Sequence, residues 1–126
     1  MRLYLAVAAG GAVGAVSRYA LGAAVEPLLH PGFPIGTLAA NVAGSFLMGV
    51  LVEVLALVWS PPEAVRAFLV VGVLGAFTTF SAFSMEAVAL LQDGAVGAAT
   101  AYILASVVLS LAGIFAGMRL LRRALS

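Results

Sequence analysis

Four long apolar stretches, separated by short polar breaks, form the main pattern along the chain. They cover residues 3–29, 35–59, 64–91 and 95–120, and each exceeds the ~20 helical residues that cross the hydrocarbon core of a bilayer. The breaks between them carry turn-forming residues, such as Gly32 with Pro34, Pro61 with Pro62, and Gly94. The pattern predicts an all-α membrane protein of four transmembrane helices, with residues 1–126 forming a single transmembrane domain.

The composition supports the same prediction and excludes several function classes. Of the 126 residues, 64% are hydrophobic and 9% are charged, and the mean hydropathy is +1.21. A soluble domain of this size keeps too much surface in water to hide so many apolar side chains. The basic residues are all Arg and form no basic tract, so nucleic-acid binding is not expected. The chain has no Cys and only one His, His30, and no acid pair is spaced for proton transfer, so we expect no enzyme.

The distribution of Arg predicts an orientation in the membrane. After four crossings both termini lie on one side, together with the connection that precedes Arg66. Five of the six Arg residues fall on that side, and the opposite connections carry none. The positive-inside rule therefore favours cytoplasmic termini.

Small residues recur four apart in the predicted helices, a spacing that lets helix backbones approach closely in lipid. Because four thin helices enclose little interior, we expect a homodimer, the simplest closed assembly. The small-residue pairs are Gly10 with Gly14, Ala40 with Gly44, Ser45 with Gly49, and Gly113 with Gly117.

The third stretch has an unusual middle. Residues 72–84 contain two Gly, four hydroxyl residues and three Phe, and Gly and Thr are weak helix formers. A break near residues 75–79 would release carbonyl groups, which is tolerated only where they are buried in protein or line a cavity. Such carbonyls suit a small dehydrated cation such as sodium. The alternative is a continuous helix whose hydroxyls bond back to its own carbonyls, and the residues alone leave both open.

Polar and aromatic side chains at bilayer depth are the candidates for an ion path. They are mostly hydrogen-bond donors, and a donor-rich lining suits a compact anion. Each also has a simpler explanation, because amides and hydroxyls join helices, Phe residues pack, and an Arg near a helix end extends to the interface. The candidates are Arg18, Glu86, the stripe of Thr37, Asn41, Ser45 and Met48, the file of Tyr102, Ser106 and Ser110, and Phe80 with Phe83.

Three segments that carry these residues resemble the Fluc (CrcB) fluoride channels. They are GGAVGAVSRY at 10–19, PIGTL at 34–38 followed by NVAGSF at 41–46, and GAFTTFSAFS at 75–84. The resemblance implies a passive, fluoride-selective channel of bacterial inner membranes that lowers cytoplasmic fluoride. It also implies a homodimer of antiparallel subunits with two pores. This dual topology and the single orientation favoured by the Arg residues remain open alternatives.

The resemblance further implies roles for individual residues. Phe80 and Phe83 match positions that contact permeating fluoride, and Asn41 matches a pore-lining amide. Gly75 and Thr78 match the break positions whose backbone carbonyls hold a structural sodium ion that is bound and not transported. The other residues expected along the fluoride path are Arg18, Thr37, Thr79, Ser81, Glu86, Tyr102, Ser106 and Ser110.

Two other functions are compatible with the pattern. A proton-coupled multidrug exporter of the small four-helix type has a similar length, but it needs a buried acid. Because the first stretch has no acid in mid-span, Glu86 would have to serve. A scaffold that transports nothing would use Asn41 and the hydroxyls only to join helices.

Overall fold

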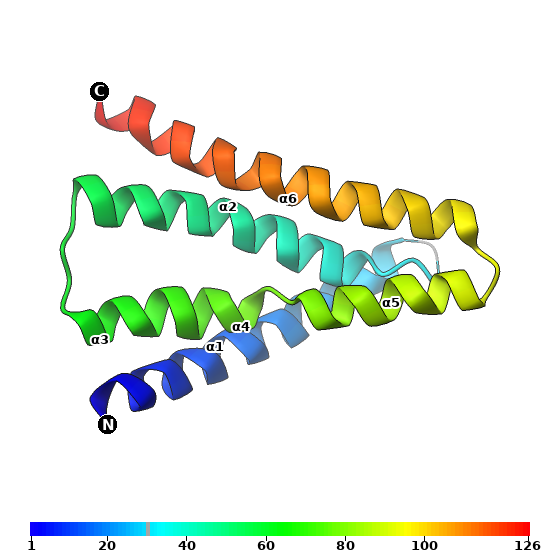
Figure 1. The fold of residues 1–126 in the computed structure, drawn as a ribbon, viewed down its shortest axis with the longest axis horizontal. Coiled ribbons are helices and arrows are strands. Elements are labelled where there is room, and N and C mark those ends of the chain that lie inside the picture. Colours follow the sequence, from blue (N-terminus) through cyan, green and yellow to red (C-terminus); the bar gives the residue numbers. More distant parts are fainter. Residues whose placement is uncertain (30) are drawn as a thin grey trace.

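The computed structural model describes residues 1–29 and 31–126, so His30 lies outside the described residues. Four helical segments of this part are long and apolar enough to cross a membrane, which confirms the predicted four membrane helices. The elements are α1 (Arg2–Val25) with η1 (Glu26–Leu28), α2 (Ile35–Leu57), α3 (Glu63–Arg66), η2 (Ala67–Leu74), α4 (Gly75–Phe77), α5 (Phe80–Gln92) and α6 (Val96–Leu125) (Figure 1).

The helix ends differ from the predicted boundaries by a few residues. The first span leaves α-helical geometry after Val25 and ends in one 3₁₀ turn that contains Pro27, which has no amide N–H to continue the helix. The last helix extends beyond the predicted end at residue 120, to Leu125. Near that end Arg122 of α6 forms an ion pair of 2.9 Å with Glu53 of α2, whose side chain is 3% exposed. This contact holds the last turn of α6 against α2.

The helices pack as two close pairs, α2 with α6 and α1 with η2. Glycine makes both contacts possible. A Cβ atom built on Gly14 would collide with the carbonyl oxygen of Val73, and one on Gly117 would collide with that of Phe46. The prediction that small residues bring helices together is confirmed at these positions.

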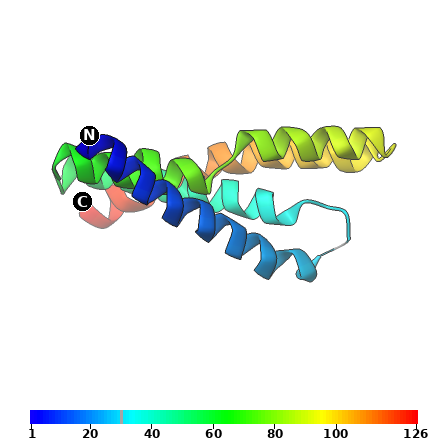
Figure 2. The same ribbon diagram turned by 90° about the horizontal axis from the view of Figure 1, so that it is seen from below.

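The third span changes direction in the middle of the bundle. Helix α4 ends at Phe77, Thr78 and Thr79 have extended backbone, and α5 begins at Phe80. Before the interruption the span packs on α1, and after it on α6. Figure 2 shows α5 lying along the start of α6, away from the end of α1. The interruption therefore turns the third span from one neighbour to another.

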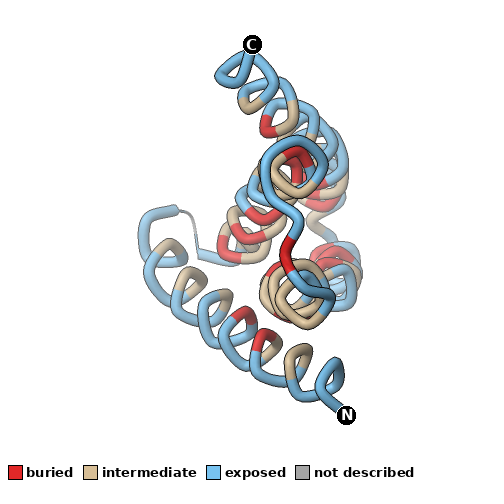
Figure 3. Tube along the Cα trace, turned by 90° about the vertical axis from the view of Figure 1, so that its left-hand side faces the viewer, coloured by how far each residue is buried: buried red, intermediate tan, exposed pale blue. Residues whose placement is uncertain are grey.

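The interior is small, as expected for four thin helices. Figure 3 shows buried residues only where helices face each other, with most of the outer surface exposed. The main buried cluster lies between α5 and α6 and consists of Phe83, Ala87, Leu90, Ala99 and Tyr102. Both termini and the connection after α2 lie at the same end of the molecule (Figure 1), as an even number of crossings requires.

Candidate functional site

The interruption in the third span is bonded to a side chain of α2. The Oδ1 atom of Asn41 accepts a hydrogen bond of 2.7 Å from the Thr79 backbone N–H, and its Nδ2 atom donates to the Thr79 carbonyl at 3.0 Å. Extended backbone at bilayer depth needs such partners, because lipid offers none. An amide is suited to this position because it is both donor and acceptor. One N–H of the Asn41 amide remains for another acceptor.

Other side chains bond to three further backbone groups around the interruption. The Thr79 hydroxyl oxygen accepts from the Ala82 N–H at 3.2 Å and caps α5. The Thr78 hydroxyl donates to the Leu74 carbonyl at 3.0 Å. Arg18 of α1 donates from Nε to the Ala76 carbonyl at 3.3 Å, and a positive charge is favourable at this C-terminal end of α4. The interruption is thus held from both α1 and α2.

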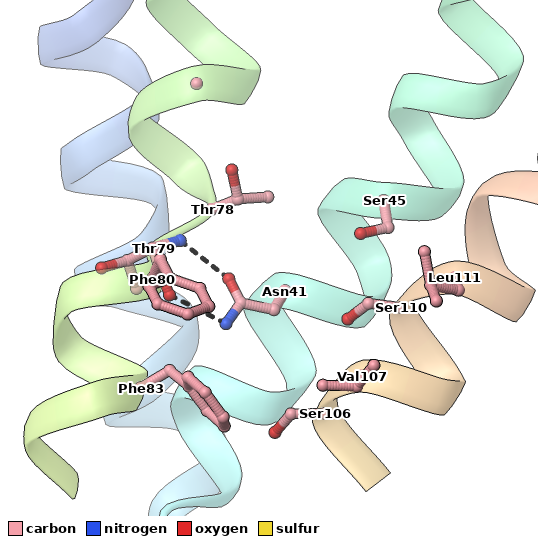
Figure 4. Close-up of a pocket in the computed structure, with 11 residues that line it drawn as sticks. Asn41, Ser45, Thr78, Thr79, Phe80, Phe83, Ser106, Val107, Ser110 and Leu111 are labelled. Carbon is pink, nitrogen blue, oxygen red and sulfur yellow. Dashed lines mark hydrogen bonds between the residues drawn. The ribbon is translucent and has the colours of Figure 1, made fainter. Parts of the chain in front are cut away.

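A cavity of about 470 Å³ lies beside the interruption, between α2, the third span and α6. Figure 4 shows the two hydrogen bonds of Asn41 on one side and the serines of α6 on the other. The cavity brings together eight of the residues expected along the fluoride path or at the sodium site. The lining residues are Asn41, Ser45, Gly75, Thr78, Thr79, Phe80, Phe83, Ser106, Val107, Ser110 and Leu111.

The Ser106 hydroxyl is available for a ligand in this cavity. Its Oγ is buried and has no hydrogen-bond partner among the described residues. By contrast, the Thr100 hydroxyl in the same helix donates to the Val96 carbonyl, four residues earlier, as hydroxyls in membrane helices commonly do. Because an unpaired buried hydroxyl is unfavourable, the Ser106 hydroxyl is a strong candidate ligand group.

Aromatic rings lead away from the cavity. The ring centroids of Phe80 and Phe83 lie 5.5 Å apart, and those of Phe83 and Tyr102 lie 5.3 Å apart. Phe33 packs on Tyr102 at 5.6 Å with an interplanar angle of 82°. The exposed fraction is 78% for Phe80 and 9% for Phe83. The row of rings therefore runs from Phe80, at the surface of the chain, to Phe83 and Tyr102 in the main buried cluster, with the partly buried Phe33 packed against it.

Tyr102 connects this row to Glu86. Its hydroxyl donates to Oε2 of Glu86 at 2.6 Å, and the Thr37 hydroxyl donates to Oε1 at 2.8 Å. Both oxygens of the carboxyl group therefore have a donor, and the two donors come from α2 and α6. Glu86 joins three spans at this point.

Glu86 also lines a second cavity, of about 240 Å³. It contains three further predicted residues, Arg18, Thr37 and Glu86, so the arginine borders the same space as the carboxyl group. The lining residues are Arg18, Tyr19, Gly22, Ala23, Glu26, Gly36, Thr37, Ala82 and Glu86. The two cavities are linked through the contacts of Tyr102 with Phe83 and with Glu86.

The structure also shows where prediction from sequence was incomplete. Ser81 lines neither of these two cavities, because it is exposed and its hydroxyl lies 3.4 Å from that of Thr79. Ser45 lines the first cavity. The sequence placed it on the same helix stripe as Asn41, but it was not among the residues expected along the fluoride path. Phe33 precedes α2, and nothing in its local sequence indicated its contact with Tyr102.

Comparisons with known proteins identify the family of this chain. Residues 5–118 match the family model described as CrcB-like protein, Camphor Resistance (CrcB). A Rhodospirillum centenum protein named Fluoride-specific ion channel FluC is 52% identical over 126 residues, which cover 100% of both chains. An Agrobacterium fabrum protein of the same name is 54% identical over 114 residues, or 90% of this chain and 91% of that one.

The similarity covers all four spans and therefore both cavities. The match also includes the interruption and every predicted site residue, since these lie between positions 18 and 110. The family is one of ion channels and not of enzymes. The protein is a multi-pass membrane protein that belongs to the CrcB family of fluoride-specific ion channels.

Proposed function

We propose that the protein is a passive, fluoride-selective channel of the bacterial inner membrane that lowers cytoplasmic fluoride. The observation that carries this proposal is the buried Ser106 hydroxyl, which has no hydrogen-bond partner in the described part of the chain and faces a cavity also lined by the Asn41 amide. Relatives that are about half identical over 90% or more of the chain have the name fluoride-specific ion channel.

The lining of the first cavity suits a small anion that has lost its water. The hydroxyls of Ser106 and Ser110 and the remaining N–H of Asn41 are donors. The positive edges of the rings of Phe80 and Phe83 add weaker attraction to an anion. Donors that packing holds in place can replace the water around an anion without having to move. They favour a small halide because its charge is concentrated.

The path would continue through Tyr102, Glu86 and Thr37 into the second cavity. Arg18 borders that cavity, and its positive charge would raise the local concentration of anions. The hydrogen bonds to Glu86 hold its two carboxyl oxygens against Thr37 and Tyr102, which reduces their capacity to repel a passing anion.

A homodimer of antiparallel subunits would complete each path. Phe80 lines the first cavity but is 78% exposed in a single chain, so one wall of the path is still uncovered. A second copy in the opposite orientation would cover this ring and give two equivalent pores, as expected for a closed twofold assembly.

The same dimer would hold a structural sodium ion at the interruptions of its two third spans. The residues present fit this ion, because Gly75 and Thr78 border the first cavity and offer backbone carbonyl oxygens, the ligand type that sodium prefers at broken helices. When bound, sodium supplies a positive charge that offsets the carbonyl dipoles.

Reconstituted liposomes test the proposed channel. Vesicles that contain the purified protein are loaded with potassium fluoride, and efflux after valinomycin addition is followed with a fluoride electrode. We expect rapid fluoride release without a proton gradient, and chloride release no faster than from empty vesicles. Equal efflux rates for fluoride and chloride would overturn the proposed selectivity for fluoride. Uptake of a lipophilic cation dye that requires a proton gradient would identify an exporter instead.

A further inference from the structure

We infer that the side chains of Asn41 and Thr79 create the sodium site by keeping two backbone N–H groups away from the carbonyls of Gly75 and Thr78. This inference rests on the proposed structural sodium ion. It makes Asn41 and Thr79 positioning residues for the cation, in addition to their place beside the proposed fluoride path.

The argument begins with the hydrogen bonds of a continuous helix. There each N–H donates to the carbonyl four residues earlier. The N–H of Thr79 would therefore occupy the Gly75 carbonyl, and the N–H of Ala82 would occupy the Thr78 carbonyl. A carbonyl that already accepts such a bond is a poorer ligand for a cation.

In the structure both of these N–H groups donate to side chains. The Thr79 N–H donates to Oδ1 of Asn41 at 2.7 Å, and the Ala82 N–H donates to Oγ1 of Thr79 at 3.2 Å. These are the two N–H groups whose helical acceptors would be the proposed sodium ligands. Other side chains near the interruption, such as Arg18, bond to carbonyls of other residues.

The geometry also couples the cation site to the anion path. The Asn41 amide donates to the Thr79 carbonyl at 3.0 Å and so holds this residue at both of its backbone groups. The same amide lines the first cavity, as do Gly75 and Thr78. Removing the amide therefore allows the third span to become a continuous helix and to close off the carbonyls.

Sodium titration of the purified, full-length protein tests this inference. The melting temperature in detergent is measured as sodium chloride replaces N-methyl-D-glucamine chloride at constant ionic strength. Asn41→Leu removes the acceptor for the Thr79 N–H, and Thr79→Val removes the acceptor for the Ala82 N–H. For each variant we expect the sodium concentration at half-maximal stabilisation to rise by about fivefold or more, the equivalent of one regained backbone hydrogen bond.

Two further variants serve as controls. Thr79→Ser keeps a hydroxyl acceptor, so it should retain the sodium dependence of the unmodified protein. Thr100→Val removes a hydroxyl that bonds within α6, away from the interruption, and it should leave the sodium midpoint unchanged.

The outcomes separate this inference from the proposed function. A sodium midpoint that stays unchanged in both Asn41→Leu and Thr79→Val would overturn the inference, and Thr79→Val decides the matter if Asn41→Leu does not fold. If the unmodified protein shows no sodium dependence, the sodium ion of the proposed function is wrong and the inference fails with it. Fluoride selectivity is measured separately in liposomes, so its result does not depend on this titration.

Discussion

The Asn41 side chain is bonded to both backbone groups of Thr79, accepting from its N–H at 2.7 Å and donating to its carbonyl at 3.0 Å. The two residues lie 38 positions apart and belong to different spans. In a regular helix or sheet, backbone groups bond to other peptide groups. Here a side-chain amide forms these bonds. Neither a carboxylate nor an apolar side chain supplies a donor and an acceptor together.

Replacing Asn41 by Leu should destabilise the protein. In saturating sodium, where the proposed ion keeps the Gly75 carbonyl as its ligand, the change leaves the Thr79 N–H without an acceptor, and an unsatisfied buried group costs about 1–3 kcal/mol in the free energy of unfolding. Chemical unfolding in detergent measures this loss. Thr100→Val, which removes a hydroxyl bonded within its own helix, should change the stability by less than about 0.5 kcal/mol. Equal stability of Asn41→Leu and the unmodified protein would contradict the structural role of the amide.

The sequence was sufficient to predict the four membrane helices, because their apolar runs exceed the bilayer thickness. It also identified Asn41 and Ser106 as polar residues at depth. It did not predict that Asn41 bonds to Thr79 or that Arg18 bonds to the Ala76 carbonyl. Such pairs depend on how the helices rotate and cross, which the spacing within one helix does not determine.

The packing surface of η2 was also not predictable. The π-helical geometry of Ala67–Leu74 places backbone carbonyls against α1, and π-helices are too rare to predict from composition. The small size of Gly10 and Gly14 indicated that another helix approaches α1 closely, but not which helix. Only the structure identifies η2 as that neighbour.

Gly14→Ala should destabilise the protein, whereas Gly11→Ala should not. A Cβ atom on Gly14 would collide with the Val73 carbonyl, while one on Gly11 meets nothing within 4 Å. Overpacking of a tight contact costs about 1–3 kcal/mol. Both changes give the helix the same gain in propensity, so the difference in melting temperature between the two variants isolates the contact. Equal melting temperatures would show that α1 and η2 can separate without loss.

The hydroxyls of Tyr102 and Thr37 should be energetically coupled to Glu86. Tyr102 is fully buried, so Tyr102→Phe removes the 2.6 Å hydrogen bond to Glu86 and preserves the packing of the ring. A double-mutant cycle with Glu86→Met, which removes both acceptor oxygens, should give a coupling energy of about 0.5–3 kcal/mol. A coupling energy near zero would mean that the hydrogen bond adds nothing to stability.

The two phenylalanines of the first cavity should contribute differently to the stability of the protein. Phe83 is 9% exposed and contacts both Phe80 and Tyr102, so Phe83→Ala leaves a void and costs about 3–5 kcal/mol. Phe80 is 78% exposed in a single chain. Phe80→Leu keeps an apolar side chain at this position and should therefore reduce the stability much less than Phe83→Ala.

Transport distinguishes a packing role from a role in the ion path. If the edge of the Phe80 ring faces permeating fluoride, Phe80→Leu removes an attraction of about 1 kcal/mol and should slow fluoride efflux from liposomes by about fivefold to tenfold. Size-exclusion chromatography of the same sample shows whether its assembly is unchanged. Fluoride efflux by Phe80→Leu at the rate of the unmodified protein would mean that this ring serves packing alone, because the substitution removes the aromatic edge and little of the apolar volume.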